Sequence, residues 1–207
     1  MKKLHALLIG NGEKISPAFL HKLAAAADAV FAADGGAVAC ARARLTPQRI
    51  IGDLDSIPPA LKKKWADKLL RINTQQNTDL EKALCYLSEA GFTSCTLAGF
   101  WGNRPDFSMG NLLALFRFCT KMELRAVTPE WSIYPVTKST RLPCAKGKRV
   151  SLIAVKNCRG VTLSGLKYPL QNASVPLGST LTLSNVARAD IFEITLKSGA
   201  MLVCNEN

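Results

Sequence analysis

The sequence predicts an α/β protein, in which an N-terminal Rossmann-like parallel-sheet domain is followed by a small C-terminal all-β sandwich. Up to about residue 129, short apolar segments alternate with segments of helical periodicity, which is typical of a parallel sheet covered by helices on both faces. Beyond that point the chain consists of short runs rich in β-branched residues. We expect an α/β domain over residues 1–135 and a β-sandwich over residues 136–207, with the basic segment 138–149 near the join.

Local signals place the elements of the first domain. Ser16 and Pro17 form a helix start, with a hydroxyl to cap the first turn and a proline at the first helical position. Thr78 and Glu81 match a capping box, after which apolar residues recur at helical spacing. The expected strands are 5–9, 29–33, 50–52, 69–72, 95–98 and 124–128, and the expected helices are 18–27, 37–44, 59–68, 78–90 and 111–120. The glycine-bearing, polar segment 99–110 is predicted to be a loop.

The second domain is predicted from its β-branched runs, because no helical stripe appears there. Glycine, asparagine, proline and serine, which are common turn residues, separate these runs. The expected strands are 150–155, 161–163, 180–183, 191–196 and 200–204.

Composition restricts the class of protein. Of the 207 residues 48% are hydrophobic, and no repeat or low-complexity tract is present, which argues against a disordered chain. Seven cysteines are scattered without a CxxC pair, as expected for reduced thiols in a cytoplasmic protein. The apolar run at the N-terminus ends at Gly10 after a few residues, so we interpret it as a strand and not as a signal peptide. No segment is long enough to span a bilayer, so we expect no membrane partner.

The net charge of +12 is compatible with binding of nucleic acid or of a polyanionic small molecule. Basic residues concentrate at 62–64 and between 138 and 159, but they are not interleaved with aromatic residues. No nucleic-acid-binding motif accompanies them. Nucleic acid is therefore the less favoured partner, although composition alone leaves both open.

The chain is organised around the segment Ile50–Ser56, where an apolar run ends at Gly52 and two carboxylates follow, Asp53 and Asp55. An apolar run stopped by glycine predicts the carboxyl end of a buried strand, which is where open α/β sheets bind ligands. If the segment stays extended, the two carboxylates point the same way and suit a hard cation such as Mg²⁺. The alternative is an ordinary polar turn.

Two further acidic residues follow or begin predicted elements, Asp34 after a strand and Asp79 at a helix start. Since the carboxyl ends of parallel strands meet at one edge of a sheet, these carboxylates and those of Asp53 and Asp55 can converge on one metal. Carboxylates without His or Cys favour Mg²⁺ over zinc or iron. Taken singly, each has a structural explanation, because Asp-Gly is a common turn and an acid at a helix start complements the helix dipole.

Other features suit phosphate. Gly35 allows close approach of the backbone to a ligand, and helix N-termini offer free N–H groups. Arg104, near Asp106 in the glycine-bearing loop, can clamp a phosphate or can simply be solvated. The sequence contains neither a Walker loop nor the Gly-x-Gly-x-x-Gly fingerprint of dinucleotide-binding proteins.

Taken together and in order, these motifs resemble the thiamine pyrophosphokinase (thiamin diphosphokinase) family. The matching segments are residues 33–36 (Ala-Asp-Gly-Gly), 52–56 (Gly-Asp-Leu-Asp-Ser), 77–84 (Asn-Thr-Asp-Leu-Glu-Lys-Ala-Leu), 102–106 (Gly-Asn-Arg-Pro-Asp), 165–170 (Gly-Leu-Lys-Tyr-Pro-Leu) and 184–185 (Ser-Asn). Each is weak alone, but the set spans nearly the whole chain.

The resemblance implies an enzyme that transfers diphosphate from ATP to thiamine, giving thiamine diphosphate and AMP, with Mg²⁺ as cofactor. It implies a homodimer, with thiamine between one subunit's α/β domain and the other's β-sandwich. The implied catalytic and metal-binding residues are Asp53, Asp55 and Asp79; the implied ATP or phosphate residues are Asp34, Gly35, Ser56, Thr78, Lys82, Arg104 and Asp106; the implied thiamine residues are Gln75, Tyr168, Ser184 and Asn185.

The sequence departs from the family pattern at several positions. Thr74 and Gln76 stand where acids are common in the family, and Phe107 stands where a histidine is common. The segment 183–186 also departs from the family's Thr-Ser-Asn-Glu. These departures leave two alternatives, a related Mg²⁺-dependent phosphotransferase acting on another hydroxylated small molecule, and a basic nucleic-acid-binding protein that reuses the fold.

Overall fold

The computed structural model describes residues 3–102 and 104–207, so Asn103 of the predicted phosphate loop lies outside the described residues. The chain divides into two compact units, Met1–Ala126 and Val127–Asn207. This division lies closer to the N-terminus than the expected boundary after residue 135. Within the described residues, no helix has both the length and the apolar character needed to cross a bilayer.

The first unit is built on a sheet of parallel strands. Its strands are β1 (Leu4–Ile9), β2 (Ala29–Ala33), β3 (Arg49–Gly52), β4 (Leu69–Arg71), β5 (Phe92–Ala98) and β6 (Glu123–Val127). Their spatial order is β4-β3-β2-β1-β5-β6, and the strands from β4 to β5 pair in parallel. The order reverses at β1, because the chain adds β2 on one side of it and β5 on the other. Such a reversal opens a crevice at the carboxyl ends of the strands, where ligands bind in this type of sheet.

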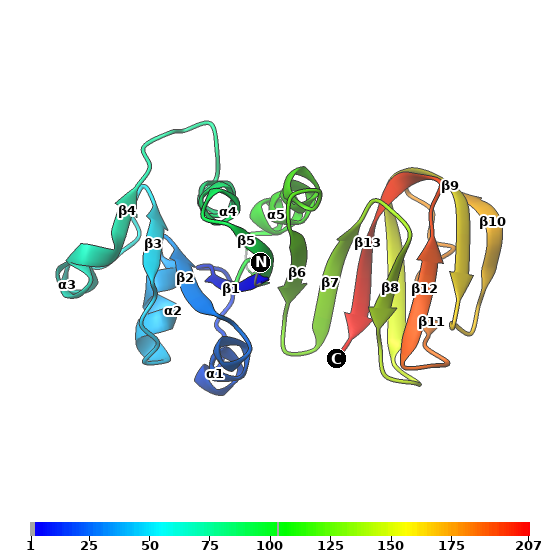
Figure 1. The fold of residues 1–207 in the computed structure, drawn as a ribbon, viewed down its shortest axis with the longest axis horizontal. Helices are drawn as coiled ribbons and strands as arrows, with labels where there is room; N and C mark the ends of the chain where they lie inside the picture. Colours follow the sequence, from blue (N-terminus) through cyan, green and yellow to red (C-terminus); the bar gives the residue numbers. More distant parts are fainter. Residues whose placement is uncertain (1–2, 103) are drawn as a thin grey trace. The chain divides into compact units, whose positions relative to one another are not determined.

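Helices cover both faces of this sheet. They are α1 (Pro17–Ala25), α2 (Gly36–Arg42), α3 (Pro59–Lys64), a short 3-10 helix (Ala66–Lys68), α4 (Asp79–Glu89) and α5 (Pro105–Phe118). In Figure 1, α4 and α5 lie on one side of the strands and α1 and α2 on the other. The central strands are therefore buried on both faces, which explains why their sequences are nearly continuous apolar runs.

The helix α5 begins earlier than the sequence predicts. Residues 99–110 were expected to be a loop, but the helix starts at Pro105. Proline at the first helical position needs no N–H partner, and the Ser108 N–H donates to the Arg104 carbonyl at 3.0 Å. The glycine and polar content of this segment hid a helix start whose first acid, Asp106, complements the helix dipole.

The second unit is all-β and antiparallel. Its strands are β7 (Trp131–Val136), β8 (Thr140–Pro143), β9 (Arg149–Ser164), β10 (Leu170–Val175), β11 (Asn185–Val186), β12 (Ile191–Thr195) and β13 (Ser198–Glu206). The first part of β9 pairs with β13, and its last part pairs with β10 and β12. Residues from both parts of β9, such as Leu152 and Val161, are buried in one core with Phe192 and Met201.

Two predicted strands, 150–155 and 161–163, are parts of the single strand β9. The polar residues between them suggested a break, but they form an irregularity in which Gly160 has a φ of 65°. The predicted strand 180–183 is wrong, because it is a turn in which Thr182 alone is buried and donates to the Leu152 carbonyl at 2.6 Å. The short strand β11 follows it. The strands β7, β8 and β10 were not predicted, and β8 lies within the segment expected near the join.

Candidate active site

Three carboxylates meet at the carboxyl edge of the first unit's sheet. Asp34 follows β2, Asp53 follows β3, and Asp79 is the first residue of α4. One oxygen from each lies within 4.8 Å of the others. Because β2 and β3 are parallel neighbours and α4 packs against both, their ends bring these three side chains to one place.

Gly52 makes this convergence possible. A Cβ atom at this position would lie 2.9 Å from the Asp34 Cβ and 3.0 Å from the Asp79 Oδ1. Those distances are shorter than van der Waals contact, so any larger residue would force the two carboxylates away from their positions. The glycine that ends the predicted strand is therefore required by the approach of the acids, as well as by the backbone turn.

The Asp34 carboxylate is held in place but incompletely paired. Its residue has a φ of 41°, a conformation that aspartate tolerates better than most side chains. Asp34 is only 6% exposed, and its Oδ2 accepts a hydrogen bond from the Ser56 N–H at 3.2 Å. Its Oδ1 is buried without a hydrogen-bond partner among the described residues. A buried carboxylate oxygen without a partner is costly, and a hard cation bound by the three acids would remove that cost.

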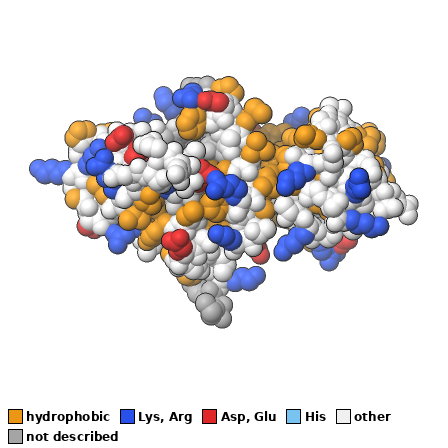
Figure 2. Space-filling view, turned by 90° about the horizontal axis from the view of Figure 1, so that it is seen from above, with side chains coloured by type: hydrophobic (Ala, Val, Ile, Leu, Met, Phe, Trp, Pro, Cys, Tyr) orange, Lys and Arg blue, Asp and Glu red, His pale blue; other side chains and the backbone are white. Residues whose placement is uncertain are grey.

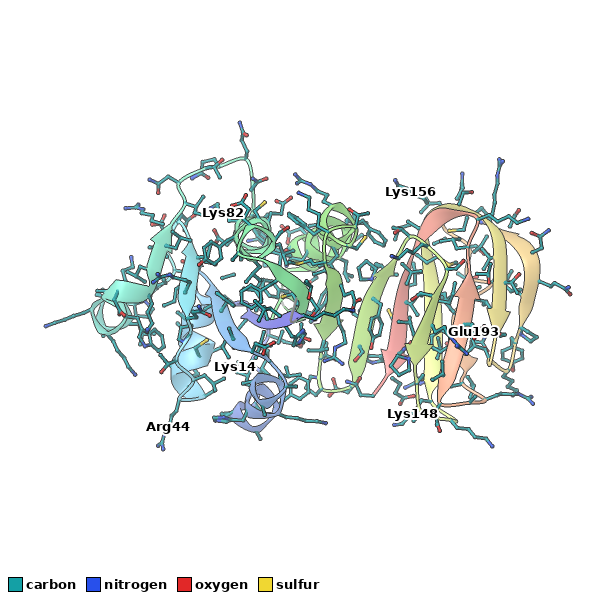
Figure 3. All side chains as sticks on the ribbon, viewed as in Figure 1. Lys14, Arg44, Lys82, Lys148, Lys156 and Glu193 are labelled. Carbon is teal, nitrogen blue, oxygen red and sulfur yellow. The ribbon has the colours of Figure 1, made fainter. Side chains whose placement is uncertain are left out.

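A buried lysine stands beside the acidic group. The Lys82 side chain is 4% exposed, and its Nζ donates to the Asp79 Oδ1 at 2.9 Å. The label in Figure 3 places it on α4. The capping box predicted for this helix is present, since the Thr78 hydroxyl accepts from the Glu81 N–H and the Glu81 carboxylate accepts from the Thr78 N–H. The first turn of α4 thus presents both an acid and a cation.

Asp55 does not join the acidic group, contrary to the expectation that Asp53 and Asp55 point the same way. The extended conformation ends at Gly52, and Leu54 has a φ of 69°. The Asp55 N–H donates to the Asp53 Oδ1 at 3.1 Å, which closes a turn and leaves Asp55 exposed. Leu54 is buried in this turn, and its apolar side chain takes the inward position.

Arg104 and Asp106 form an exposed pair at the start of α5. The Arg104 Nε and Nη2 donate to the two Asp106 carboxylate oxygens at 2.9 and 2.6 Å. The Arg104 guanidinium also lies 4.5 Å from the centroid of the Phe107 ring. These hydrogen bonds lower the pKa of Asp106 to about 2, so the acid keeps its charge at any pH near neutrality. The Arg104 side chain is therefore oriented on the surface by both Asp106 and Phe107.

A cavity of about 440 Å³ adjoins the acidic group. Of the predicted site residues, Asp34, Gly35, Ser56, Thr78, Asp79 and Arg104 line it. Residues that sequence reasoning missed also line it, and these include Asn11, Phe100, Trp101, Phe107, Ser108 and Asn111. The loops after β1 and β5 form part of its wall, where the Gly12 N–H donates to the Gly99 carbonyl at 2.6 Å. The signal that was available for these loops was their position after neighbouring parallel strands.

The predicted thiamine residues lie in both units. Gln75 is exposed in the loop before α4, and Tyr168 is 58% exposed in the second unit. Asn185 is buried, and its Oδ1 accepts from the Tyr168 N–H at 3.0 Å while its Nδ2 donates to the Tyr168 carbonyl at 2.7 Å. Ser184, with a φ of 56°, is exposed. The structure therefore places Asn185 as a clamp on the backbone of Tyr168.

Comparison with known protein families agrees with this arrangement. The model of the thiamin pyrophosphokinase catalytic domain matches residues 20–128, and the model of the thiamin pyrophosphokinase vitamin B1 binding domain matches residues 135–201. The chain belongs to the thiamin pyrophosphokinase family. The acidic group of the first unit lies within the match to the family's catalytic domain, and Tyr168 and Asn185 lie within the match to its vitamin B1 binding domain.

Individual relatives show the same relation. Thiamine pyrophosphokinase 1 of rice is 28% identical over 173 residues, which are 76% of this chain and 65% of the rice protein. Thiamine pyrophosphokinase of Bacillus subtilis is 28% identical over 160 residues, covering 73% of this chain and 75% of that protein. The chain thus matches about two thirds of the length of the rice relative.

Solved structures show that the fold is shared. The crystal structure of thiamine pyrophosphokinase from Bacillus subtilis aligns with a TM-score of 0.86 at 23% identity and covers 98% of this chain and 99% of its own. That of thiamin pyrophosphokinase from Geobacillus thermodenitrificans aligns with a TM-score of 0.85 at 22% identity, with coverages of 99% and 98%. The mixed α/β architecture with its parallel strands is therefore the fold of these solved members.

Proposed function

We propose that this protein transfers a diphosphate group from ATP to the hydroxyl of thiamine, giving thiamine diphosphate and AMP. The observation that carries the proposal is the convergence of Asp34, Asp53 and Asp79 beside a cavity, in a chain that belongs to the thiamin pyrophosphokinase family. Diphosphate transfer needs positioning and neutralisation of charge more than covalent catalysis, and these residues suit both tasks.

The acidic group fits Mg²⁺, because it offers only carboxylate oxygens, one of them buried and without a partner among the described residues. We assign Asp34, Asp53 and Asp79 as the residues that would hold the ion. This revises the set inferred from sequence, with Asp34 in place of Asp55. When bound, the ion would neutralise phosphate charge and orient the transferred group.

The cations near the cavity would hold the polyphosphate. Lys82 is paired with Asp79 and carries its charge into a buried position. Arg104 lines the cavity and is oriented by Asp106, so its remaining N–H donors can face a phosphate. Gly35 and the first turn of α4 line the same wall, where the N–H groups of Asp79 and Leu80 are not used by the capping box.

In the reaction, the thiamine hydroxyl oxygen bonds to the β-phosphorus of ATP while the bond from that phosphorus to the AMP oxygen breaks. The hydroxyl proton needs an acceptor, and we assign it to Asp55. Asp79 already accepts a hydrogen bond from Lys82 and belongs to the acidic group. Asp55 follows Asp53 by two residues, is exposed, and does not belong to that group.

Thiamine is cationic, so we propose that Tyr168 covers it with the face of its ring. Gln75 and Ser184 are exposed and available as polar contacts. Asn185 would act through Tyr168, because it bonds both the N–H and the carbonyl of that residue. Tyr168 is 58% exposed, so its ring is accessible to a ligand, and the ammonium group of Lys167 already lies 5.2 Å from the ring centroid.

We further propose that the second unit is a β-sandwich, with β9 shared between its layers, and that the enzyme acts as a cytoplasmic homodimer. The two-part pairing of β9 and the common core support the sandwich. Lys and Arg side chains are scattered in small groups over the face seen in Figure 2.

The test is a turnover assay with purified protein, Mg²⁺, ATP and thiamine, in which AMP and thiamine diphosphate are separated by chromatography. We expect the two products in equal amounts. If AMP forms only with a different hydroxylated acceptor, the protein is a related phosphotransferase. If there is no turnover, and RNA or DNA binds in a salt-sensitive manner, the protein uses this fold for nucleic-acid binding.

A further inference from the structure

The carboxylate of Glu81 connects two helices beside the acidic group. Its Oε2 accepts a hydrogen bond from the Thr78 N–H at 2.9 Å and lies 3.3 Å from the Thr78 hydroxyl oxygen. Its Oε1 accepts from the Nη1 of Arg117, which belongs to α5. The capping box requires only the contact to Thr78, so the contact to Arg117 is an additional bond between α4 and α5.

The bond between Glu81 and Arg117 is made at the first turn of α4, which also carries Asp79 of the acidic group. Asp79 precedes Glu81 by two residues, and Lys82 follows it directly. The ends of helices open more readily than their interiors, and a small rotation of this turn would move the Asp79 oxygen away from those of Asp34 and Asp53. An additional bond at the third residue of the helix restricts that rotation.

The helix that supplies Arg117 is itself anchored to the cavity wall. The buried side chain of Asn111, on α5, donates from Nδ2 to the Phe100 carbonyl at 3.0 Å. Leu115 and Phe118 are buried on the same helix. Arg117 therefore extends from a fixed element, and it can transmit the position of α5 to the first turn of α4.

Stability alone does not explain the pair well. The Arg117 side chain is 63% exposed, although that of Glu81 is only 11% exposed, and an ion pair with one solvated partner adds little to stability. Its partner is a carboxylate that is already hydrogen-bonded in the capping box. The effect of the ion pair on metal affinity through the position of Asp79 can be larger, because metal affinity depends strongly on the groups that orient the metal ligands.

We propose that Glu81 and Arg117 are positioning residues, whose ion pair holds the first turn of α4 in the orientation at which Asp79 joins the acidic group. The kinetic consequence rests on the proposed function. The geometric consequence, tighter binding of a divalent cation, does not depend on whether thiamine is the acceptor.

The experiment compares Arg117→Leu, Arg117→Lys and the wild type, with Mn²⁺ binding followed by electron paramagnetic resonance. We expect Arg117→Leu to weaken Mn²⁺ binding about tenfold and Arg117→Lys to restore most of it. In the turnover assay, kcat should fall in Arg117→Leu while the KM for thiamine changes little. Glu81→Gln keeps the size of the side chain and removes its charge, so it should weaken Mn²⁺ binding in the same direction.

The control is Arg141→Leu, which removes a similarly exposed arginine of the second unit. Its partner is Glu193, which is labelled in Figure 3. Arg141→Leu should leave Mn²⁺ binding unchanged. The proposal is overturned if Arg117→Leu binds Mn²⁺ as the wild type does, if Arg117→Lys loses as much affinity as Arg117→Leu, or if Arg141→Leu loses as much. A wild type without Mn²⁺ affinity overturns it together with the metal site. A wild type that binds Mn²⁺ but makes no thiamine diphosphate overturns the proposed function alone.

Discussion

Two buried polar arrangements, one in each unit of this protein, differ in how far their hydrogen bonds are satisfied. In the first unit, three carboxylates face one another, and one oxygen of Asp34 has no partner among the described residues. In the second unit, both polar atoms of the buried Asn185 bond to the backbone of Tyr168. The first arrangement leaves a buried oxygen without a partner, whereas the second is complete and presents an aromatic ring.

This difference indicates how each unit would contribute to the proposed reaction. Like charges held close together oppose folding, so the acidic group is costly unless an ion neutralises it. The clamp on Tyr168 has no such cost, because its hydrogen bonds are satisfied within the unit. We therefore expect changes in the first unit to alter metal binding and kcat, and changes in the second unit to alter the KM for thiamine.

The largest effect is expected for Asp53→Asn. Loss of one of three metal-holding carboxylates should lower turnover on the order of 10³-fold, since charge neutralisation supplies most of the catalysis in such transfers. The thermal unfolding temperature should stay the same or rise, because one of three like charges is removed. The matched control is Asp67→Asn, an exposed acid that pairs with Lys68, and it should leave turnover unchanged. Retained turnover in Asp53→Asn would contradict the metal-holding role.

Gly52→Ala should lower turnover about 100-fold. The added Cβ would lie 2.9 Å from the Asp34 Cβ and would push the carboxylates of the acidic group apart. Mn²⁺ binding should weaken in parallel. Gly110→Ala provides the control, since a Cβ there meets no atom within 4 Å and the residue lies within α5. That variant should be active and slightly more stable. Equal activity in both variants would show that the close approach at Gly52 is unimportant.

Tyr168→Ala tests the second unit. Loss of the ring should raise the KM for thiamine up to about tenfold and leave the KM for ATP unchanged, as expected for a cation–π contact. Asn185→Leu should act in the same direction through Tyr168. Leu177→Ala, another exposed side chain of this unit, is the control and should change neither constant. A rise in both KM values would mean that Tyr168 does not act on thiamine specifically.

The smallest effect concerns pH and His5, which lies outside the acidic group. Its Nδ1 and Nε2 lie 2.8 Å from the Ser94 Oγ and 3.1 Å from the Thr96 Oγ1. Burial, and then the charge of Arg125, lower the pKa of His5 below its usual value of 6.5, although Asp28 raises it in part. Below pH 6.5, His5 is protonated in the unfolded chain while it is still largely neutral in the folded one. The free energy of unfolding should therefore fall with decreasing pH until the folded His5 is also protonated.

Urea unfolding of wild type and His5→Gln at pH 7.5 and at pH 5.5 measures this contribution. The loss of stability on acidification should be smaller in His5→Gln, which has no proton to bind at this position. His21→Gln is the control, because His21 is exposed on α1 and its replacement should leave the loss unchanged. An equal loss in wild type and His5→Gln would contradict the assignment.

Much of the first unit was predictable because its strands are buried on both faces and its helices carry local start signals. Apolar runs such as that ending at Gly52 have few alternatives, and Ser16 and Thr78 cap helices where the sequence predicts. Asp34, Asp53 and Asp79 were identifiable because they follow or begin such elements. The exclusion of Asp55 was not predictable, because it depends on the positive φ of Leu54, and leucine is not expected there.

The rest of the site and of the second unit depends on tertiary contacts. Phe100 and Trp101 line the cavity because the loop after β5 packs on the loop after β1, which no local pattern reveals. The alternation of Leu181, Thr182 and Leu183 is that of a strand, yet the Leu183 N–H donates to the Thr180 carbonyl at 3.1 Å and closes a turn, which the bond from Thr182 to Leu152 ties to β9. In the second unit, pairing partners decide the structure more than local preference does.

The most direct measurement for the central claim is Mn²⁺ binding to the wild type, Asp53→Asn and Asp55→Asn, followed by electron paramagnetic resonance. The structure places Asp53 within the acidic group and Asp55 outside it. We expect binding to be lost in Asp53→Asn and kept in Asp55→Asn, although Asp55→Asn should lose turnover as the proposed proton acceptor. Equal binding in all three proteins, or equal loss in the two variants, would contradict the claim that Asp34, Asp53 and Asp79 form the metal site.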